Sequence, residues 1–406
     1  MYIDFRNICL YNNCMEKIIF HIDVNNAFLS WTAVDYLKKG YNIDLRNIYS
    51  VIGGEQKSRQ GVVLAKSPLA KRCGIITGEP IYQSKKKCPD LQTFPPDFKL
   101  YHEQSLKLKE LLSKYSDNIE SFSIDEVFME YIPLFGSYMD VAKKIQKEIY
   151  DTLGFTVNIG ISTNKLLAKM ASDFEKPNKI HTLFKEEIET KMWPLPIEEL
   201  FYLGKASAKK LHDIGIKTIY DLAHANVNTL KHILKSHGIQ LYEYANGIDN
   251  SCINNQCFAP KSISNSVTLE KDLITDEEII QEILVLGDKT ASRLRSEKLK
   301  CKTITITLKT NYYKVYSSSH SLAHYTDITK ELLAVAKDIF YSMYTKEPIR
   351  LVGVGLSNLK DTEEAQLSLF DTENEKQTKI DKTVDNLLNK YGNITRASLM
   401  KNKTRK

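Results

Sequence analysis

The sequence predicts a multidomain α+β protein, and three features of the 406-residue chain support this prediction. The chain is longer than one ordinary hydrophobic core supports, which indicates about two to four domains. Apolar, strand-like runs at residues 17–23, 120–131 and 155–162 are separated by helical stretches. After residue 258 the order of strand, helix, strand, strand, helix and strand indicates a split βαβ sandwich.

Composition and charge narrow the function classes. The 56 basic and 50 acidic residues give a formal net charge of +6, which permits nucleic-acid binding without requiring it. The seven cysteines form no C-x-x-C pair and no zinc spacing. Because no apolar run is long enough to cross a bilayer, we expect a cytoplasmic protein with reduced thiols and no membrane contact. Residues 1–16 lack periodicity and are interpreted as an N-terminal extension, with Met15 as an alternative start.

The first strand is predicted at Lys17–Asp23, an apolar run that ends in an acid. This pattern is typical of a central strand that delivers a carboxylate at its C-terminal edge. Asn25 or Asn26 can cap the helix that follows. Phe28 lies one turn into that helix, next to the acid, and taken alone it is better explained as a core residue.

Residues 42–96 are predicted to form a small basic subdomain of short strands and turns. Pro68 suits the first turn of a short helix that Gly74 closes. The basic residues of this region are Lys57, Arg59, Lys66, Lys71, Arg72 and Lys85–Lys87. A run such as Lys85–Lys87 is also explained as a solvated face.

Residues 119–131 place two adjacent acids, Asp125 and Glu126, inside an apolar, strand-like run. Neighbouring side chains of a regular strand point to opposite faces, so both can reach one point only at a turn or a strand end. We therefore predict a hairpin with strands Glu120–Ser123 and Val127–Tyr131 and the acids near its tip. The alternative is a solvated acidic turn.

A helix is predicted at Tyr101–Tyr115, and a second one lies around residues 141–149. The strand Phe155–Ser162 leads into a helix at Thr163–Phe174 that presents Lys165 and Lys169 outward. A lysine in a first helical turn opposes the helix dipole. Lys165 is therefore a candidate anion ligand, with an ordinary surface lysine as the alternative, because helix N-termini also bind phosphate.

The candidate site combines Asp23, Asp125, Glu126 and Lys165. Carboxylates together with substrate phosphates are typical ligands of Mg²⁺. Two such ions would stabilise both the attacking and the leaving oxygen of a phosphoryl transfer.

Residues 200–222 indicate two short helices around Gly204 and Gly215, a helix-hairpin-helix that can bind a DNA phosphate. A plain helical pair is the alternative. Residues 258–263 are the predicted linker to the last domain. There Thr275 caps a long helix that ends near Arg293 and Arg295, and the strand Lys302–Lys309 alternates isoleucine with threonine.

From Lys360 the chain is polar, which predicts a tail. Gln366–Phe370 stands out there, because exposed Leu and Phe in such a segment often bind a partner's pocket. A later run, Ile380–Tyr391, is compatible with a short amphipathic helix.

The motifs described above resemble those of the Y-family, translesion DNA polymerases. They occur in the order that is usual for this family and cover the chain from Met15 to the tail. They are Asp23–Phe28, Ser123–Glu126, Gly160–Lys169 with Lys176–Asn178, Leu203–Leu211 and Gln366–Phe370.

The resemblance implies the fold of a right-hand polymerase, with palm, small fingers, a helical thumb with a helix-hairpin-helix and a βαββαβ little finger. The implied ranges are 17–40 and 97–185 for the palm, 41–96 for the fingers, 186–250 for the thumb, 251–258 for the linker, 259–360 for the little finger and 361–406 for the tail.

The resemblance also implies residue roles. Two Mg²⁺ ions would be bound by Asp23, Asp125, Glu126 and the carbonyl of Val24. Lys165 would hold the triphosphate, and Phe28 would be the steric gate against ribonucleotides. The other nucleotide-binding candidates are Asn26, Ala27, Lys71 and Arg72. The DNA-binding candidates are Gly204, Lys205, Lys209, Lys210, Arg293, Arg295 and Lys302. Gln366, Leu367, Ser368, Leu369 and Phe370 would bind the bacterial sliding clamp.

Two departures from the family pattern leave the branch open. Many members carry a tyrosine and an arginine in the fingers where this chain has Pro68 and Lys71, and a lysine lacks the bidentate fork of arginine. Asn26 and Ala27 replace aromatic residues that are common in DNA polymerase IV. The motifs therefore do not choose between a branch similar to DNA polymerase IV and one similar to the catalytic subunit of DNA polymerase V.

The expected function is template-directed DNA synthesis past damaged template, of low fidelity and without proofreading, by a monomer that binds primer-template DNA, dNTPs and the clamp. The alternative is a catalytically idle DNA- and clamp-binding protein of the same fold. A palm-fold nucleotidyl cyclase would lack the thumb hairpin and the clamp peptide.

Overall fold

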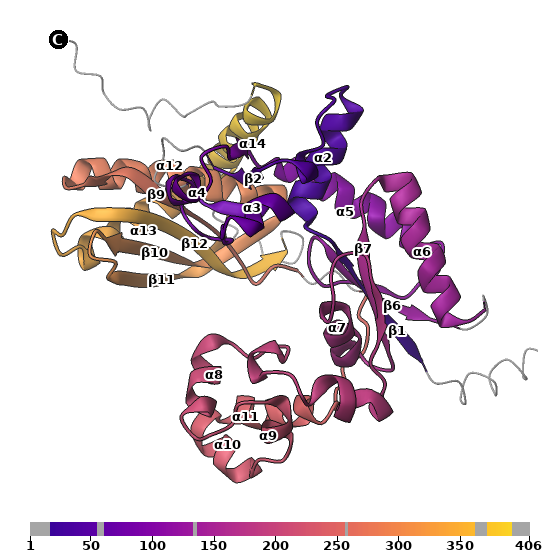
Figure 1. Ribbon diagram of the computed structural model, residues 1–406. Coiled ribbons are helices and arrows are strands. Elements are labelled where there is room, and N and C mark those ends of the chain that lie inside the picture. Colours follow the sequence, from indigo (N-terminus) through magenta and orange to yellow (C-terminus); the bar gives the residue numbers. More distant parts are fainter. Residues whose placement is uncertain (1–16, 55–60, 133–135, 256–258, 362–371, 392–406) are drawn as a thin grey trace, which may run out of the picture. The chain divides into compact units, whose positions relative to one another are not determined.

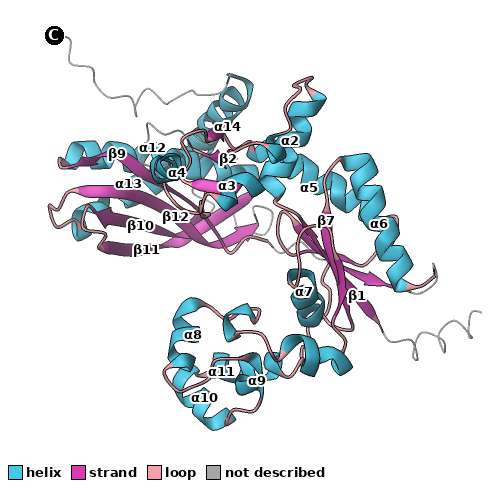
Figure 2. Cartoon of the chain, in the orientation of Figure 1, coloured by secondary structure: helices cyan, strands magenta, loops and turns pink. Residues whose placement is uncertain are grey.

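The computed structural model describes residues 17–54, 61–132, 136–255, 259–361 and 372–391. The chain forms two compact units, of which the first contains Met1–Glu55 and Gly61–Cys257 and the second contains Phe258–Lys406. Both units contain helices and strands, as predicted (Figures 1 and 2). Among the described residues, no helix is long and apolar enough to span a membrane.

The palm region of the first unit is a five-stranded sheet with the order β5-β6-β1-β7-β8. Strand β1 pairs antiparallel with both β6 and β7, and β5 and β6 form the predicted hairpin. The strands are β1 (Ile18–Val24), β5 (Ile119–Ser121), β6 (Glu126–Tyr131), β7 (Val157–Ser162) and β8 (Ile180–Thr182).

Helices cover both faces of this sheet (Figure 1). The apolar side chains of β1 form one core with α2 (Ala27–Lys38), α5 (Phe98–Leu112) and α6 (Tyr138–Leu153), while α7 (Lys165–Asp173) packs on the other face. Helix α5 begins three residues before the predicted Tyr101. Its start is set by Asp97, whose carboxylate accepts a hydrogen bond from the Leu100 N–H at 3.0 Å.

Gly160 sets the distance between α7 and the sheet. A Cβ atom at this position would lie 1.9 Å from the carbonyl oxygen of Ala168 and 2.5 Å from the backbone nitrogen of Ser172. Both atoms belong to the backbone of α7, so a side chain could be accommodated only by moving the helix. Glycine therefore allows α7 to lie directly on β7.

The fingers region is a small sheet with the order β3-β2-β4 and its own hydrophobic core. Its elements are β2 (Ser50–Gly53), β3 (Val63–Lys66), α3 (Pro68–Arg72), α4 (Ile81–Lys87) and β4 (Gln92–Phe94). Pro68 opens α3 as predicted, and the side chain of Ser67 caps this helix. Gly74, which follows α3, has the positive φ of 77° that favours glycine.

The thumb region is helical. It contains α8 (Lys205–His212), α9 (Ile219–Ala223), α10 (Val227–Leu234) and α11 (Ser236–Ala245). Short 3₁₀ or π turns at Lys185–Glu187, Ile188–Met192 and Ile197–Glu199 precede α8. Another short turn, at Leu45–Asn47, lies between α2 and β2. The core of the thumb also includes Leu166 and Leu167 of α7, so this helix joins the thumb to the palm sheet.

The second unit has the predicted βαββαβ order, with all four strands antiparallel in the sheet β11-β10-β12-β9. Its elements are β9 (Ser262–Leu273), α12 (Asp276–Ser296), β10 (Leu299–Thr310), β11 (Val315–Thr326), α13 (Thr329–Met343) and β12 (Ile349–Asp361). Ile304 and Ile306 of β10 are fully buried under the helices. The threonines of the other face bond the serines of β11, for example Thr305 Oγ1 with Ser319 Oγ at 2.9 Å.

The predicted polar tail contains a longer helix than expected. Helix α14 (Thr372–Tyr391) replaces the short run predicted at Ile380–Tyr391 and packs on α13. Its Asp381 is only 2% exposed and accepts a hydrogen bond from the Thr329 N–H at 2.9 Å. This part of the tail is therefore an ordered element of the second unit.

Candidate active site

The register of the palm sheet brings the predicted acids together. Asp23 of β1 lies directly opposite Glu126 of β6. The next residue, Val24, donates its N–H to the carbonyl oxygen of Asp125 at 3.0 Å. The end of the first strand and the tip of the hairpin are thus neighbours, as predicted from the positions of the strand ends in the sequence.

Asp23 is buried and paired with a lysine. It is 6% exposed, and burial raises its pKa to about 6, although the nearby charge of Lys176 acts in the opposite direction. The Lys176 ammonium donates to Asp23 Oδ2 and also contacts Asp173 Oδ1 at 2.8 Å. Asp23 therefore lies where a positive charge is needed to stabilise its ionised form.

Glu126 is paired with a second lysine. Lys169 Nζ donates to Glu126 Oε1 at 2.7 Å and contacts Asp173 Oδ2 at 3.1 Å. Burial acts to lower the pKa of Lys169, but the hydrogen bond with Glu126 and the surrounding acids raise it overall. The prediction that Lys169 points outward is wrong, because this residue is only 7% exposed under the acidic end of the hairpin.

Asp125 is partly exposed, and its Oδ1 accepts a hydrogen bond from Ser123 Oγ at 2.7 Å. No three Asp, Glu, His or Cys side chains of the described chain gather as a preformed metal-binding group. The donor set nevertheless suits a hard divalent cation, because carboxylates and a backbone carbonyl are oxygen ligands. Asp23 is buried, and the ammonium of Lys176 stabilises its ionised form. A bound cation would stabilise it in the same way.

Lys165 is engaged elsewhere. Its Nζ donates to both carboxylate oxygens of Glu120, at 2.7 and 2.8 Å, and lies 5.0 Å from the ring centroid of Phe128. Glu120 also accepts a hydrogen bond from the Asn254 N–H at 2.8 Å. Among the described residues, the partner of Lys165 is thus Glu120, and the structure does not bring this lysine to the carboxylates of Asp23, Asp125 or Glu126.

The lysines that do reach the acids were not among the predicted site residues. The sequence pattern places Lys169 on the outward face of its helix and Lys176 only within a family motif. Helical spacing could have pointed to Lys169, which lies one turn after Lys165. No spacing rule could have found Lys176, because it lies in the loop after α7.

Phe28 lies at the start of α2, where its ring stacks on Tyr101 at a centroid distance of 4.6 Å and an interplanar angle of 12°. Ala27 is buried, and Asn26 is the exposed residue before the helix. The Asn26 amide donates to the carbonyl oxygen of Lys66 at 2.8 Å rather than capping α2. This bond connects the Phe28 turn to β3 of the fingers.

Lys71 and Arg72 are exposed in the last turn of α3. Thumb residue Gly204 is the N-cap of α8, and Lys205, Lys209 and Lys210 are exposed on that helix. These positions are compatible with the predicted contacts to phosphate, because each cation is accessible to solvent.

The predicted DNA-binding residues of the second unit differ in their exposure and contacts. Arg293 is exposed and donates to Asn265 Oδ1 at 2.6 Å, and Lys302 Nζ lies 5.8 Å from the ring centroid of Tyr325. Arg295 is different, because its side chain is 7% exposed and makes a bidentate pair with Asp385 of α14 at 2.6 and 2.9 Å. Arg295 is thus covered by α14, and its contact with DNA stays a prediction.

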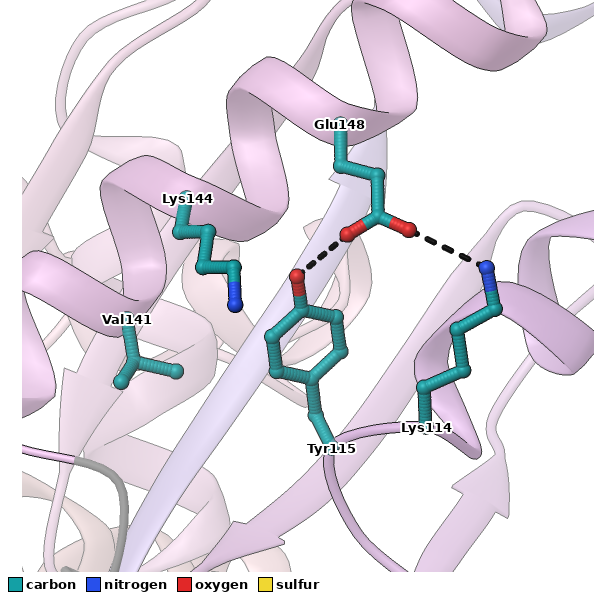
Figure 3. Close-up of a pocket in the computed structure, with 5 residues that line it drawn as sticks. All are labelled: Lys114, Tyr115, Val141, Lys144 and Glu148. Carbon is teal, nitrogen blue, oxygen red and sulfur yellow. Dashed lines mark hydrogen bonds and ion pairs between the residues drawn. The ribbon is translucent and has the colours of Figure 1, made fainter.

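A small pocket of about 200 Å³ lies between α6 and the end of α5 and contains none of the predicted site residues (Figure 3). Its Glu148 accepts hydrogen bonds from the hydroxyl of Tyr115 and from Lys114, the latter at 3.1 Å. These two bonds lower the pKa of Glu148. The pocket is lined by Lys114, Tyr115, Val141, Lys144 and Glu148. It lies on the face of the sheet opposite α7, so it is not part of the candidate site.

Comparison with protein families identifies three segments of the chain. Residues 22–173 match the impB/mucB/samB family, and residues 260–369 match the C-terminal domain of that family. Residues 185–216 match the helix-hairpin-helix motif of the same family and overlap residues 200–222, where the sequence predicts this motif. The described fold and the family match therefore agree in the palm, the thumb and the second unit.

Similar proteins extend the match over almost the whole chain. A protein of Clostridium acetobutylicum named DNA polymerase IV is 48% identical, with 97% of this chain and 100% of that protein covered. A DNA polymerase IV of Oceanobacillus iheyensis is 36% identical, with 96% and 93% covered. A solved chimera of the Y-family DNA polymerases Dbh and Dpo4 has the same fold, with a TM-score of 0.75, 22% identity and 85% and 99% of the two chains covered. The chain therefore belongs to the impB/mucB/samB family of Y-family DNA polymerases, as its motifs predicted.

Proposed function

We propose that this protein is a translesion DNA polymerase that extends a primer 3′-hydroxyl with dNTPs on a DNA template. The observation that supports this function best is the pairing of Asp23 with Glu126, beside Asp125, in a chain that matches DNA polymerase IV relatives over nearly its full length. The test is primer extension by the purified protein on undamaged and damaged templates. An idle DNA-binding protein of the same fold would bind the primer-template and not extend it.

The division into palm, fingers, thumb, linker, little finger and tail is proposed on the same basis. Y-family polymerases use divalent metals, and we propose two Mg²⁺ ions bound by Asp23, Asp125, Glu126 and the carbonyl of Val24. When bound, these ions supply Lewis-acid stabilisation of the attacking and leaving oxygens. The protein itself orients the ligands: the β1–β6 register sets Asp23 opposite Glu126, and Ser123 holds the carboxylate of Asp125.

We assign the dNTP triphosphate to Lys176 in place of Lys165. The ammonium of Lys176 contacts Asp23, and its side chain is 40% exposed, so a phosphate in the site can reach it. Lys169 is buried, and its ammonium orients Glu126. Lys165 is paired with Glu120, which also accepts the N–H of Asn254, so its charge is compensated by an acid other than Asp23, Asp125 and Glu126.

Lys176→Ala should therefore raise the KM for dNTP. A hydrogen bond to a charged group contributes roughly 1.5–3 kcal/mol, which corresponds to about a 10- to 100-fold change. The measurement is single-nucleotide insertion at varied dNTP concentration. Lys165→Ala is the matched control and should change the KM less than threefold, as an order-of-magnitude bound for a residue without triphosphate contact. A larger effect of Lys165→Ala than of Lys176→Ala would reverse the assignment.

We propose that Phe28 is the steric gate that excludes ribonucleotides. Phe28 lies at the start of α2, five residues after Asp23, and its ring stacks on Tyr101, so it cannot easily move away from a 2′-hydroxyl. Phe28→Ala should raise ribonucleotide incorporation by at least about tenfold, since removal of a steric clash is worth more than 1.4 kcal/mol. Competition between dCTP and rCTP measures this preference. An unchanged sugar preference would exclude Phe28 from this role.

DNA contacts are proposed for six thumb and little-finger residues, of which Lys302 is partly buried and the others are exposed. They are Gly204, Lys205, Lys209, Lys210, Arg293 and Lys302. The threonine and serine ladder between β10 and β11 offers further hydroxyl groups for sugar-phosphate contacts. Lys71 and Arg72 of the fingers, with Asn26 and Ala27, remain candidates for contacts to the nucleotide.

The clamp-binding motif Gln366–Phe370 lies outside the described residues, and sliding-clamp binding by a monomeric polymerase is proposed from its sequence alone. Leu369→Ala combined with Phe370→Ala should spare basal primer extension and remove its stimulation by a bacterial sliding clamp, because these are the apolar anchors. Ser368→Ala is the matched control. Equal stimulation of both variants would place the clamp contact elsewhere.

A further inference from the structure

A pair of buried side-chain amides lies directly behind the catalytic aspartate. Asn158 of β7 is the register partner of Asp23, and its side chain is fully buried. Asn25 follows two residues after Asp23 and is 9% exposed. The Asn25 amide donates to Asn158 Oδ1 at 3.0 Å, so the two side chains form one unit between β1 and β7.

Asn158 binds the last turn of α7 and the segment that follows it, from the side of the sheet. Its Nδ2 donates to the carbonyl oxygens of Ser172, at 2.9 Å, and of Glu175, at 2.7 Å. Its Oδ1 accepts the N–H of Lys179 at 3.2 Å in addition to the amide of Asn25. An asparagine side chain has two N–H donors and two acceptor positions, so every one of them is used here.

Asn25 binds the same segment at a further point. The side-chain Oδ1 of Asn25 accepts the N–H of Asn178 at 2.8 Å. The backbone N–H of Asn25 donates to the carbonyl oxygen of Thr156 at 3.0 Å. Lys176 therefore lies between two anchored positions, the Glu175 carbonyl and the Asn178 N–H. The first is bound by Asn158 of β7, the strand that pairs with β1, and the second by Asn25, which directly follows β1.

The hydrogen bonds of Asn25 and Asn158 also fix the conformation of residues 175–179. Residues 175–179 are exposed, so their outer side offers no packing that would select one conformation. Buried amides are stable only when they are hydrogen-bonded, and a fully satisfied network selects a single geometry. The two amides thus transfer the rigidity of the sheet to a surface loop in which Lys176 contacts Asp23 and Asp173.

We propose that Asn25 and Asn158 are positioning residues that hold Lys176 at the site of the incoming triphosphate. The inference rests on the proposed role of Lys176 and adds the device that places it. Neither asparagine touches the nucleotide in this scheme, and both act through the backbone of residues 175–179. The placement of a charged group within a fraction of an ångström is what substrate binding requires.

The test compares Asn158→Ala and Asn25→Ala with the wild type in single-nucleotide insertion. Each variant should raise the KM for dNTP by about tenfold and change kcat by less than about threefold, as expected for lost substrate positioning. Asn25→Ala leaves the bonds from Asn158 to Ser172 and Glu175 in place, so it serves as the second variant if Asn158→Ala does not fold. Thermal unfolding of each protein checks the fold.

Ser162→Ala is the matched structural control. Ser162 lies on the same strand as Asn158, is fully buried, and donates its hydroxyl to the Leu183 carbonyl oxygen at 2.5 Å, away from residues 175–179. It should lower the unfolding temperature without changing the KM for dNTP. A KM increase in Ser162→Ala equal to that in Asn158→Ala would overturn the proposal, because the effect would then be general to buried polar residues of β7.

A double-mutant cycle decides whether the amides act through Lys176. In the Lys176→Ala background, Asn158→Ala should raise the KM by less than about twofold, since the group it positions is already absent. The same increase in both backgrounds would overturn the proposal while leaving the role of Lys176 intact. An unchanged KM in Lys176→Ala alone would overturn both, and a wild type that does not extend a primer would reject the polymerase function itself.

Discussion

Asp125→Ala is expected to abolish primer extension and to leave DNA binding intact. The carboxylate lies beside the Asp23–Glu126 pair, and its loss would remove one of the proposed Mg²⁺ ligands. The expected loss in kcat is at least about 10³-fold, which corresponds to roughly 4 kcal/mol of transition-state stabilisation. Single-turnover extension of a primer measures this loss, and a binding assay with the same primer-template verifies that the DNA complex still forms.

Ser123→Ala is the matched control for Asp125→Ala. It removes the hydroxyl that donates to Asp125 Oδ1 at 2.7 Å but keeps the carboxylate. Because the pair is solvent-accessible, we expect a loss below about tenfold in kcat. Undiminished extension by Asp125→Ala would contradict the proposed chemistry. Binding without extension by the wild type would instead support the idle DNA-binding alternative.

Arg295→Ala is expected to destabilise the second unit and release α14. Arg295 makes a bidentate pair with Asp385 and lies 3.6 Å from Asp381, whose side chain is 3% exposed. Removing one partner of a buried pair leaves the other charge uncompensated, at a cost of roughly 3–5 kcal/mol. Hydrogen–deuterium exchange should show lost protection in α14 and in the start of α13, where Asp381 binds the Thr329 N–H.

Arg293→Ala is the control on the same helix. Arg293 is exposed and its hydrogen bonds to Asn265 and the Ser264 carbonyl are on the surface, so its loss should cost less than about 1 kcal/mol. Unchanged protection of α14 in Arg295→Ala would show that other contacts hold this helix. A loss of DNA affinity in Arg293→Ala without a loss of stability would support its proposed DNA contact.

The contacts of Lys165 show which part of the site local sequence patterns do not contain. A lysine in the first turn of α7 is well placed for an anion if the helix terminus is open. In the structure, Glu120 of the hairpin reaches this position, and the carboxylate of Asp249 accepts a hydrogen bond from the Leu166 N–H at 3.1 Å. Both acids come from other parts of the chain, so no pattern within α7 could reveal them.

Lys169 and Arg295 illustrate the same limit for burial. Helical periodicity indicates which residues share a face, but it does not say what covers that face. The hairpin brings Glu126 over Lys169, and α14 brings Asp385 over Arg295, from positions 43 and 90 residues away. In each case a basic side chain is buried because it pairs with an acid that is distant in the sequence.

The sequence by itself determined the α+β class, the hairpin with Asp125 and Glu126, the βαββαβ order of the second unit and the family motifs, because these depend on local periodicity, capping and short-range pairing. The neighbouring position of Asp23 and Glu126 also followed from where strands end. Only the tertiary structure decided which cations serve the acids and how the loop of Lys176 is held. Those contacts join β1, β7 and the segment after α7, and their energy depends on burial and exact placement, which no linear pattern contains.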